Sequence, residues 1–388
     1  MKHYIWHKSV YLVLRYAAGP FVKLFMGYKC KRQRGPDAPS IIIANHNSNL
    51  DPALVGVAFS RHIYYVASEH AFRNGFASKL MTFVFNPIAI NKSHADIFAI
   101  KEMLRRLKAG ASVCLFAEGD RSYNGMTGKI APSTAKLVKA SGADLITFRI
   151  EGGYFTTPRW ARKKRGGRMS GTVVSKYAAA DIKKMTDQQI MAVIERDTYE
   201  NAYERQRKNP IRFKGKNLAE TIETAIYLCP ACKKIGGIKS KGDRFYCKCG
   251  LEAEYTETGF LEGKDLPFST IAEWDAWQAE QLAENIEEAG DAPICTDEAQ
   301  KLFRVRTAAG NEPEGEGAMF IDKERFHCAG KSFPLMQIAR FTVVGRMTLQ
   351  FALTDGTSYE VKSAVPRSAV KYKEIFRIIN EKRSDRAV

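Results

Sequence analysis

The stretch Ser40-Ile-Ile-Ile-Ala-Asn-His-Asn-Ser-Asn-Leu-Asp-Pro52 passes from an apolar, β-branched segment into a turn that carries a histidine and an aspartate. Residues 40–44 have the pattern of a buried strand, and residues 53–57 have that of a helix. Asp51-Pro52 is typical of a helix start, because a carboxylate caps free backbone N–H groups and proline suits the first helical position. The pattern therefore predicts that His46 lies where a strand ends.

Two interpretations of His46 and Asp51 remain open. In the first, Asp51 only caps the helix and His46 is an ordinary residue of a turn. In the second, the Asp51 carboxylate reaches back to one ring nitrogen of His46, fixes the tautomer and leaves the other nitrogen as a general base. Such a base activates a hydroxyl group for attack.

A second polar motif, Phe116-Ala-Glu-Gly-Asp-Arg-Ser122, follows another apolar segment at residues 111–115. Open α/β sheets bind their ligands at the carboxyl ends of their strands. If both apolar segments are strands of one sheet, the two motifs emerge at the same edge and form one site.

In these two motifs the chain resembles the glycerol-phosphate acyltransferase superfamily, and especially the 1-acylglycerol-3-phosphate (lysophosphatidic acid) acyltransferases. Those enzymes carry Asn-His-x4-Asp and, roughly seventy residues later, Phe-Pro-Glu-Gly-Thr-Arg-Ser. The first motif is matched in full, whereas Ala117 and Asp120 replace the proline and the threonine of the second. The resemblance covers roughly the first half of the chain and implies an acyltransferase-type central sheet flanked by helices.

The resemblance also implies roles for individual residues. His46 takes the proton of the acceptor hydroxyl, and Asp51 orients His46. The residues implied in binding the acceptor are Lys92, Glu118, Gly119, Arg121 and Ser122. Lys92 is the nearest match to an arginine of the family, with a solvated surface lysine as an equal alternative. We expect Glu118 to order Arg121 and the loop, and Asp120 to face solvent or pair with a cation.

The implied reaction moves a fatty acyl group from acyl-CoA or acyl carrier protein to the free hydroxyl of a lysophospholipid. The foremost acceptor is lysophosphatidic acid, which would become phosphatidic acid in phospholipid biosynthesis; another lysolipid is the alternative. A thioester is already activated and neither motif contains a cysteine, so no acyl-enzyme and no catalytic cofactor are expected.

Length and charge set wider bounds. A chain of 388 residues is long for a single domain. Its 60 Lys and Arg against 42 Asp and Glu give a net charge of +18, which favours an anionic partner, either nucleic acid or an acidic membrane surface. Four of the eight cysteines, Cys30, Cys114, Cys295 and Cys328, are scattered, which favours a reducing, intracellular compartment over a disulfide framework.

Residues 1–34 combine aromatic, apolar and basic side chains without an apolar run long enough to span a bilayer. The pattern predicts amphipathic helices, broken near Gly19-Pro20, that associate with an anionic membrane surface. A helix packed on the protein's own core is the alternative. The basic loop Arg159–Arg168 is either solvated or a second contact with anionic headgroups. With a lipid substrate, the expected location is the cytoplasmic face of a membrane, peripheral or monotopic.

The rest of the first half alternates strands and helices. Strands are expected at residues 63–67 and 145–150, helices at 95–107 and 131–140, and helical charged sequence at 181–208. Residues 35–215 are therefore expected to form one α/β acyltransferase domain.

Cys229-x2-Cys232 and Cys247-x-Cys249 have the spacing of a zinc ribbon, which we place at residues 216–256. Four thiolates around one ion leave no open coordination position, so the expected zinc is structural. Free cysteines or a redox pair are the alternatives, although no βαβ context supports redox chemistry.

The remaining chain is predicted as a helical connector at residues 257–300 and a small, mainly β domain with a final helix at 301–388. Within that domain, Gly310–Gly317 is interpreted as a turn-rich linker or loop, and short alternating runs follow it. The order of these runs loosely resembles a pleckstrin-homology-like module.

Two classes of function compete. The first is the acyltransferase, and the second is a basic zinc-ribbon protein that binds nucleic acid. The second class lacks a helix-turn-helix or aromatic RNA-binding signature and leaves the segment from His46 to Asp51 unexplained. We therefore favour the enzyme and expect no nucleic-acid partner.

Overall fold

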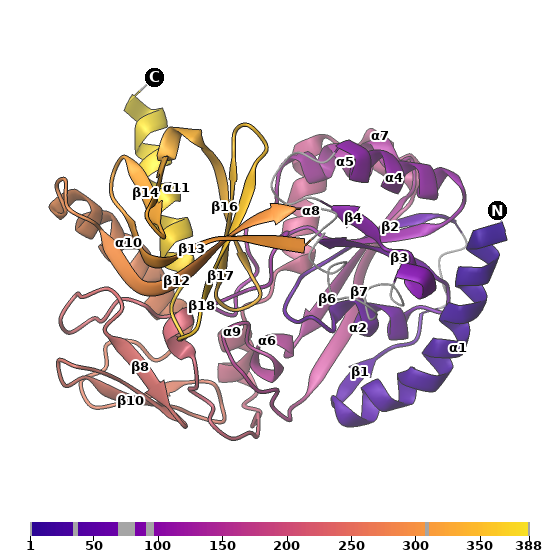
Figure 1. The fold of residues 1–388 in the computed structure, drawn as a ribbon. Helices are drawn as coiled ribbons and strands as arrows, with labels where there is room; N and C mark the ends of the chain where they lie inside the picture. The colour runs from indigo at the N-terminus through magenta and orange to yellow at the C-terminus, as the bar shows by residue number, and fades with distance from the viewer. Residues whose placement is uncertain (1, 34–37, 69–81, 91–96, 307–309, 387–388) are drawn as a thin grey trace. The chain divides into compact units, whose positions relative to one another are not determined.

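The computed structural model describes residues 2–33, 38–68, 82–90, 97–306 and 310–386 (Figure 1). The chain divides into two compact units. Unit 1 comprises residues 1–159 and 164–214, and unit 2 comprises residues 160–163 and 215–388. The boundary near residue 215 separates the α/β part from the cysteine-containing part, and the finer division into five segments stays a prediction.

Unit 1 is built on a seven-stranded sheet with the strand order β1-β7-β6-β2-β5-β3-β4. Strand β7 runs antiparallel to β6, and the other neighbouring strands are parallel. The strands are β1 Tyr28–Cys30, β2 Ser40–Ala44, β3 Ile63–Ser68, β4 Ile88–Ile90, β5 Ser112–Phe116, β6 Asp144–Glu151 and β7 Met169–Tyr177. The expected α/β sheet is confirmed, while β1 and β4 are short strands that the sequence did not reveal.

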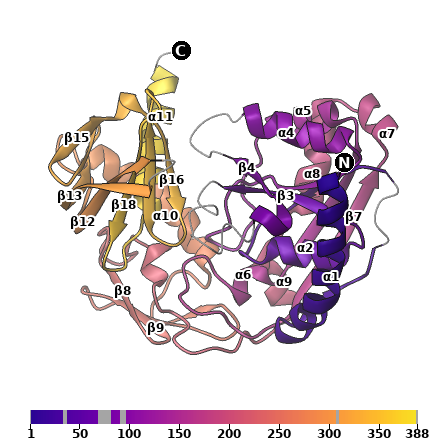
Figure 2. The same ribbon diagram turned by 45° about the vertical axis from the view of Figure 1, so that its right-hand side comes forward.

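Helices cover both faces of this sheet (Figure 2). Along β2, Ile42 and Ala44 pack in one cluster with α1 and α2, whereas Ile41 and Ile43 pack with α4, α5, α7 and α8 on the opposite face. This alternation follows from the two-residue period of a strand. The helices are α1 Lys2–Phe25, α2 Asp51–Ala58, α4 Ile97–Lys108, α5 Ser133–Ser141, α6 Gly153–Thr156, α7 Ala179–Lys184, α8 Asp187–Thr198 and α9 Ala202–Lys208.

The expected break near Gly19-Pro20 is wrong, because α1 is one helix with Pro20 inside it. Packing on both sides of the proline accounts for the continuity. Tyr11 is buried and donates its hydroxyl hydrogen to the Gly56 carbonyl oxygen at 2.6 Å, and Val22 lies in the core cluster shared with α2. Tertiary contacts therefore outweigh the local cost of a proline in the helix.

Unit 2 begins with the cysteine-bearing region, whose four-stranded antiparallel sheet has the order β11-β10-β9-β8. A long helix, α10, follows it and buries Trp274, whose indole N–H donates to the Leu228 carbonyl oxygen at 2.9 Å. The elements are η2 Ile222–Thr224, β8 Ile238–Lys241, β9 Arg244–Cys247, β10 Glu252–Tyr255, β11 Leu261–Glu262 and α10 Ile271–Glu288.

The carboxyl-terminal part of unit 2 is an antiparallel seven-stranded sheet with the order β15-β14-β13-β12-β18-β17-β16, followed by helix α11. The expected mainly β region with a final helix is confirmed. Its elements are β12 Cys295–Arg306, β13 Gly310–Ile321, β14 Arg325–Cys328, β15 Lys331–Pro334, η3 Leu335–Gln337, β16 Ile338–Val344, β17 Thr348–Leu353, β18 Ser358–Ser363 and α11 Val370–Arg386.

The interpretation of Gly310–Gly317 as a linker or loop is wrong, because these residues are the first part of β13. Strand β12 supplies cations opposite the glutamates of this segment. Glu312 pairs with Arg306 at 3.0 Å and Glu316 pairs with Lys301 at 3.4 Å. Pairing with an existing strand thus overrides the weak strand propensity of glycine and proline.

Candidate active site

His46 follows the carboxyl end of β2, and its Nδ1 lies 2.8 Å from Oδ2 of Asp51. The Asp51 carboxylate is fully buried and also accepts the backbone N–H groups of Asn47 at 2.6 Å and Ser48 at 2.8 Å. Helix α2 begins at Asp51 itself, and the carboxylate turns back to the preceding loop instead of capping the helix. A hydrogen on Nδ1 would bond to this carboxylate and leave the lone pair of a neutral ring on Nε2.

The two motifs lie next to each other. Strands β2 and β5 pair in parallel with Ala44 opposite Phe116, so both motifs leave the sheet at one edge. The His46 ring stacks on the Phe116 ring with centroids 4.5 Å apart, and the Ser122 N–H donates to the His46 carbonyl oxygen at 3.1 Å. The His46 side chain remains 21% exposed, so a substrate can reach it.

Glu118 ties the second motif to the first. Its Oε1 accepts the backbone N–H of His46 and its Oε2 accepts that of Gly128, each at 2.6 Å. These contacts make Glu118 an anchor of the histidine loop, and the prediction from the sequence was that Glu118 orders Arg121 and the loop. Burial raises the pKa of the Glu118 carboxyl to about 8.

The other residues of the second motif differ in exposure. Gly119 is exposed in the left-handed region with φ +71°, where glycine turns the chain at no steric cost. Ser122 is buried, and its Oγ accepts the Gly125 N–H at 2.9 Å. Arg121 is half-buried beside this turn. Lys92 lies outside the described residues.

Asp120 pairs with a cation, Arg159, at 3.5 Å. Arg159 also donates from Nη1 to the Arg121 carbonyl oxygen at 3.1 Å and lies over the Tyr123 ring at 4.3 Å. The sequence placed Arg159 in an exposed basic loop, yet Arg159 and Arg165 are buried while Arg162, Lys163, Lys164 and Arg168 are exposed. The loop therefore presents fewer cations to solvent than its sequence suggested.

Glu200 is a buried carboxylate of this loop network that sequence reasoning missed. It accepts the Asn47 side-chain N–H at 2.6 Å and the Gly152 N–H at 3.1 Å, and it pairs with Arg205 at 3.4 Å. Burial raises its pKa to about 7. Asn47 and Glu200 are 153 positions apart in the chain, so no local spacing signals their contact.

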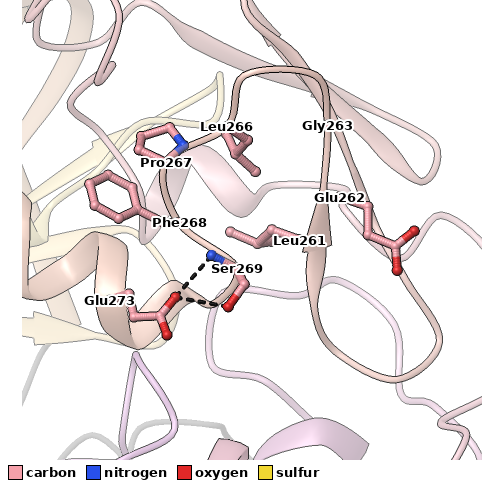
Figure 3. Close-up of a pocket in the computed structure, with 8 residues that line it drawn as sticks. All are labelled: Leu261, Glu262, Gly263, Leu266, Pro267, Phe268, Ser269 and Glu273. Atoms are coloured by element: carbon pink, nitrogen blue, oxygen red, sulfur yellow. Dashed lines mark hydrogen bonds between the residues drawn. The ribbon is translucent and has the colours of Figure 1, made fainter.

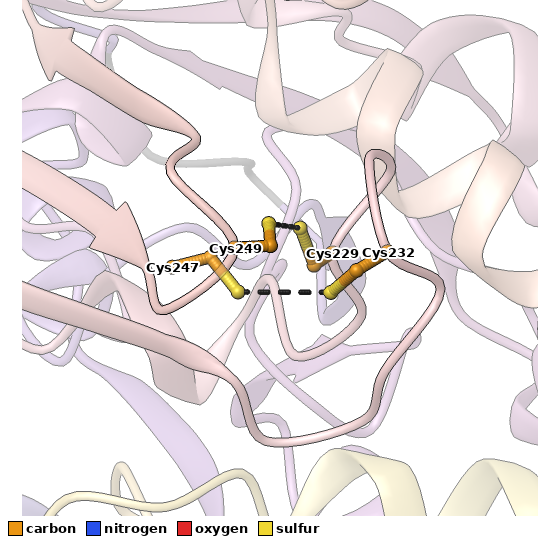
Figure 4. Close-up of side chains that lie close together, drawn as sticks. All are labelled: Cys229, Cys232, Cys247 and Cys249. Atoms are coloured by element: carbon orange, nitrogen blue, oxygen red, sulfur yellow. Dashed lines mark hydrogen bonds between the residues drawn. The ribbon is translucent and has the colours of Figure 1, made fainter.

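The four clustered cysteines of unit 2 meet in space (Figure 4). Their Sγ atoms all lie within 4.8 Å of one another, with Cys229 to Cys249 at 3.6 Å and Cys232 to Cys247 at 3.8 Å. Sulfur atoms at the corners of a tetrahedron with metal–sulfur bonds of about 2.3 Å are about 3.8 Å apart. The cluster therefore fits a closed, structural metal site.

A surface pocket of about 600 Å³ lies in unit 2 near the start of α10, with Leu261, Phe268 and Glu273 among its lining residues (Figure 3). Glu273 is engaged in capping this helix, because it accepts the N–H groups of Ser269 at 2.9 Å and Thr270 at 3.1 Å. None of the predicted catalytic or acceptor-binding residues lines this pocket, and its Glu273 carboxylate has a structural role.

Helix α1 presents two different faces. His7, Tyr11 and Val22 are buried against the rest of unit 1, whereas large apolar side chains at other positions of the helix are exposed, Leu24 by 78%. The exposed set is Trp6, Val13, Tyr16, Phe21, Leu24 and Phe25. Among the residues that the structure describes, no helix has the length and apolar character needed to cross a bilayer.

Comparison with known proteins supports the acyltransferase resemblance. Residues 28–151 match the family model for acyltransferases, and both motifs fall within the matched region. Among solved structures, the chain is similar to the 1-acyl-sn-glycerophosphate (LPA) acyltransferase PlsC of Thermotoga maritima, with 14% identity over 51% of this chain and 80% of that one, at a TM-score of 0.41. No curated protein matches the chain.

Proposed function

We propose that the chain transfers a fatty acyl group from a thioester, on coenzyme A or acyl carrier protein, to the free hydroxyl of a lysophospholipid. Lysophosphatidic acid is the first acceptor to test, because the two motifs resemble those of the enzymes that acylate it. The observation that carries the proposal is the 2.8 Å contact between His46 Nδ1 and the buried Asp51 carboxylate inside the region matched to acyltransferases.

In the proposed reaction, Nε2 of His46 takes the proton of the acceptor hydroxyl as the oxygen attacks the thioester carbonyl carbon. Collapse of the tetrahedral intermediate breaks the C–S bond, and the proton on Nε2 passes to the leaving thiolate. Asp51 stabilises the imidazolium that exists between these steps and keeps the ring in the required tautomer. The products are the ester and the free thiol.

The direct test is release of free thiol from acyl-CoA in the presence of a panel of monoacyl lipids, with and without a phosphate headgroup. Thiol release that requires a lysophospholipid supports the proposal. Salt-dependent binding to DNA without any lysolipid-dependent thiol release would instead favour the competing class, a nucleic-acid-binding protein.

We also propose that the enzyme docks on an anionic membrane surface from the cytoplasmic side, since a lysolipid resides mainly in the bilayer. The exposed apolar side of α1 supports this proposal, and Lys8 and Lys23 lie on the same helix. Two further exposed aromatic residues support it as well. Phe98, 84% exposed, lies in the first turn of α4, and the exposed Phe83 ring lies 5.8 Å from that of Trp6.

A substitution on the exposed face tests docking better than truncation to Gly35, because truncation also removes β1 from the sheet. Leu24→Ser with Phe25→Ser should weaken co-sedimentation with anionic vesicles, and added salt should weaken it further. Met336→Ser, equally exposed in unit 2, is the matched control. Unchanged binding of the double variant would show that the α1 face is not the membrane contact.

We propose zinc as the ion of the cysteine cluster, because four thiolates in a tetrahedron suit Zn²⁺. Cys229, Cys232, Cys247 and Cys249 would hold it and leave no position for a substrate. The ion would therefore stabilise unit 2 and take no part in acyl transfer.

A further inference from the structure

Two arginines of unit 1 lie together beside the His46 loop, and only one of them belongs to the second motif. Arg159 Nη1 lies 3.1 Å from the Arg121 carbonyl oxygen, and burial together with the charge of Arg159 lowers the pKa of the Arg121 guanidinium. Two guanidinium groups that share a poorly solvated position repel each other. Such an arrangement is stabilised when an anion binds both.

Arg159 is held in place from three directions. Its Nη1 contacts the Asp120 carboxylate at 3.5 Å and the Arg121 carbonyl oxygen at 3.1 Å, and its guanidinium lies over the Tyr123 ring at 4.3 Å. Only 4% of the side chain is exposed. A side chain ordered in this way loses little further conformational entropy when a ligand binds.

The Arg121 side chain differs from that of Arg159. Among the described residues, none forms an ion pair with the Arg121 guanidinium, although the residue is half-buried. A partly buried guanidinium outside any ion pair among the described residues is typical of a site for an anionic ligand. The Asp120 carboxylate, which lies next to Arg121 in the chain, contacts Arg159.

The two arginines are also close to the proposed base. Arg121 directly precedes Ser122, whose N–H donates to the His46 carbonyl oxygen at 3.1 Å. An anionic group bound by the arginines would therefore be held next to the loop that presents the imidazole. A lysophospholipid carries its phosphate and its free hydroxyl on one glycerol unit, so a phosphate here would keep that hydroxyl near the base.

We propose that Arg159 is a second phosphate-binding residue, which together with Arg121 holds the phosphate group of the acceptor, while Asp120 and Tyr123 position Arg159. This assignment rests on the proposed acyl transfer. It gives a reason for an aspartate directly before Arg121, because the Asp120 carboxylate orients the neighbouring cation. Two guanidinium forks match the oxygens and the charge of a phosphomonoester.

The test compares two acceptors with the same acyl chain, lysophosphatidic acid and monoacylglycerol, which lacks the phosphate. We expect Arg159→Ala to lower kcat/KM for lysophosphatidic acid at least tenfold, as loss of charge-assisted hydrogen bonds does, and to leave monoacylglycerol nearly unaffected. Arg159→Lys, which keeps the charge without the fork, should lie between the wild type and Arg159→Ala. Arg196→Lys on α8, where Arg196 pairs with Asp197, is the matched control.

An equal loss on both acceptors, or no loss on either, would show that Arg159 only supports the fold and would overturn the proposal. If the protein transfers no acyl group at all, calorimetry with glycerol 3-phosphate separates the two claims. If glycerol 3-phosphate binds the wild type and binds Arg159→Lys about tenfold more weakly, the anion site is supported. The absence of acyl transfer by the same protein would then contradict the proposed function alone. Binding unchanged by Arg159→Lys would overturn the assignment of Arg159.

Discussion

The His46 loop of unit 1 and the α11 end of unit 2 both hold partly buried carboxylates, but they stabilise them differently. In unit 1, the hydrogen bonds that Glu118 accepts from described residues come from the backbone N–H groups of His46 and Gly128. In unit 2, Asp297 pairs with the Lys371 ammonium at 2.8 Å and accepts the Tyr372 hydroxyl hydrogen at 2.8 Å. Glu118 relies on neutral donors, and Asp297 relies on an opposite charge.

The difference distinguishes the carboxylates around the His46 loop, which belong to the proposed reactive site, from Asp297, which supports the fold. Neutral donors hold Glu118 without supplying a cation, and for Glu200 burial outweighs the contact with Arg205, so burial raises the carboxyl pKa values, to about 8 for Glu118 and about 7 for Glu200. Groups with such pKa values cluster at functional sites. The ion pair between Asp297 and Lys371 instead joins β12 to α11, and its loss would lower the free energy of unfolding.

Metal removal should give the largest effect. In the cysteine cluster, the negative charges of four thiolates would be compensated by a single metal cation. Structural zinc contributes on the order of 10 kcal/mol to folding, so a chelator should unfold the cysteine-bearing region of unit 2. Hydrogen exchange should show loss of protection at β8 to β10 and retained protection in the sheet of unit 1. Reduced, purified protein without zinc would contradict this expectation.

Asp297→Asn should have the second-largest effect on stability. It leaves the Lys371 ammonium, only 2% exposed, without its counter-charge, which costs about 3–5 kcal/mol in the free energy of unfolding. Acyl transfer below the unfolding transition should change little. Urea unfolding monitored by fluorescence gives the stability.

The exposed pair of Glu316 and Lys301 supplies the control, because Glu316→Gln should change stability by less than about 1 kcal/mol. If Asp297→Asn lowered the free energy of unfolding no more than Glu316→Gln does, the claim that Asp297 is stabilised by the charge of Lys371 would be contradicted.

Glu200→Gln should give a smaller, pH-dependent effect. The folded-state pKa of Glu200, about 7, lies above the ordinary value of 4.5, so the folded protein disfavours the carboxylate. Wild-type stability therefore decreases as pH rises from 4.5 to about 7, by at most about 3 kcal/mol from this residue, whereas glutamine does not titrate.

The measurement is the difference in unfolding free energy between wild type and Glu200→Gln at several pH values. The exposed Glu204→Gln provides the control. A difference that is constant from pH 4.5 to 7 would mean that Glu200 has an ordinary pKa in the folded protein.

Local sequence signals predicted the parts of the fold that depend on local patterns. The strand at residues 40–44, the polar turn after it and the cysteine pairs are short-range features, and the structure contains each of them. Strand β13 was misjudged because its glutamates are matched by cations of β12, which only the pairing reveals.

The same reasoning explains what was missed in the site. Arg159 was assigned to an exposed loop because its neighbours in sequence are basic, yet its position is set by Asp120 and Tyr123. Glu200 belongs to the loop network through Asn47, far away in the chain. Buried polar contacts between distant segments leave no periodic or spacing signal in a single sequence.

The central claim is that His46 is the base of an acyl transfer, and turnover of His46→Ala tests it most directly. Lysolipid-dependent thiol release from acyl-CoA should fall by about 10³–10⁴-fold, because removal of a general base has an effect of that order. Circular dichroism and urea unfolding should match the wild type, since the His46 ring is partly exposed and its backbone contacts remain. Near-normal acyl transfer by this folded variant would contradict the account.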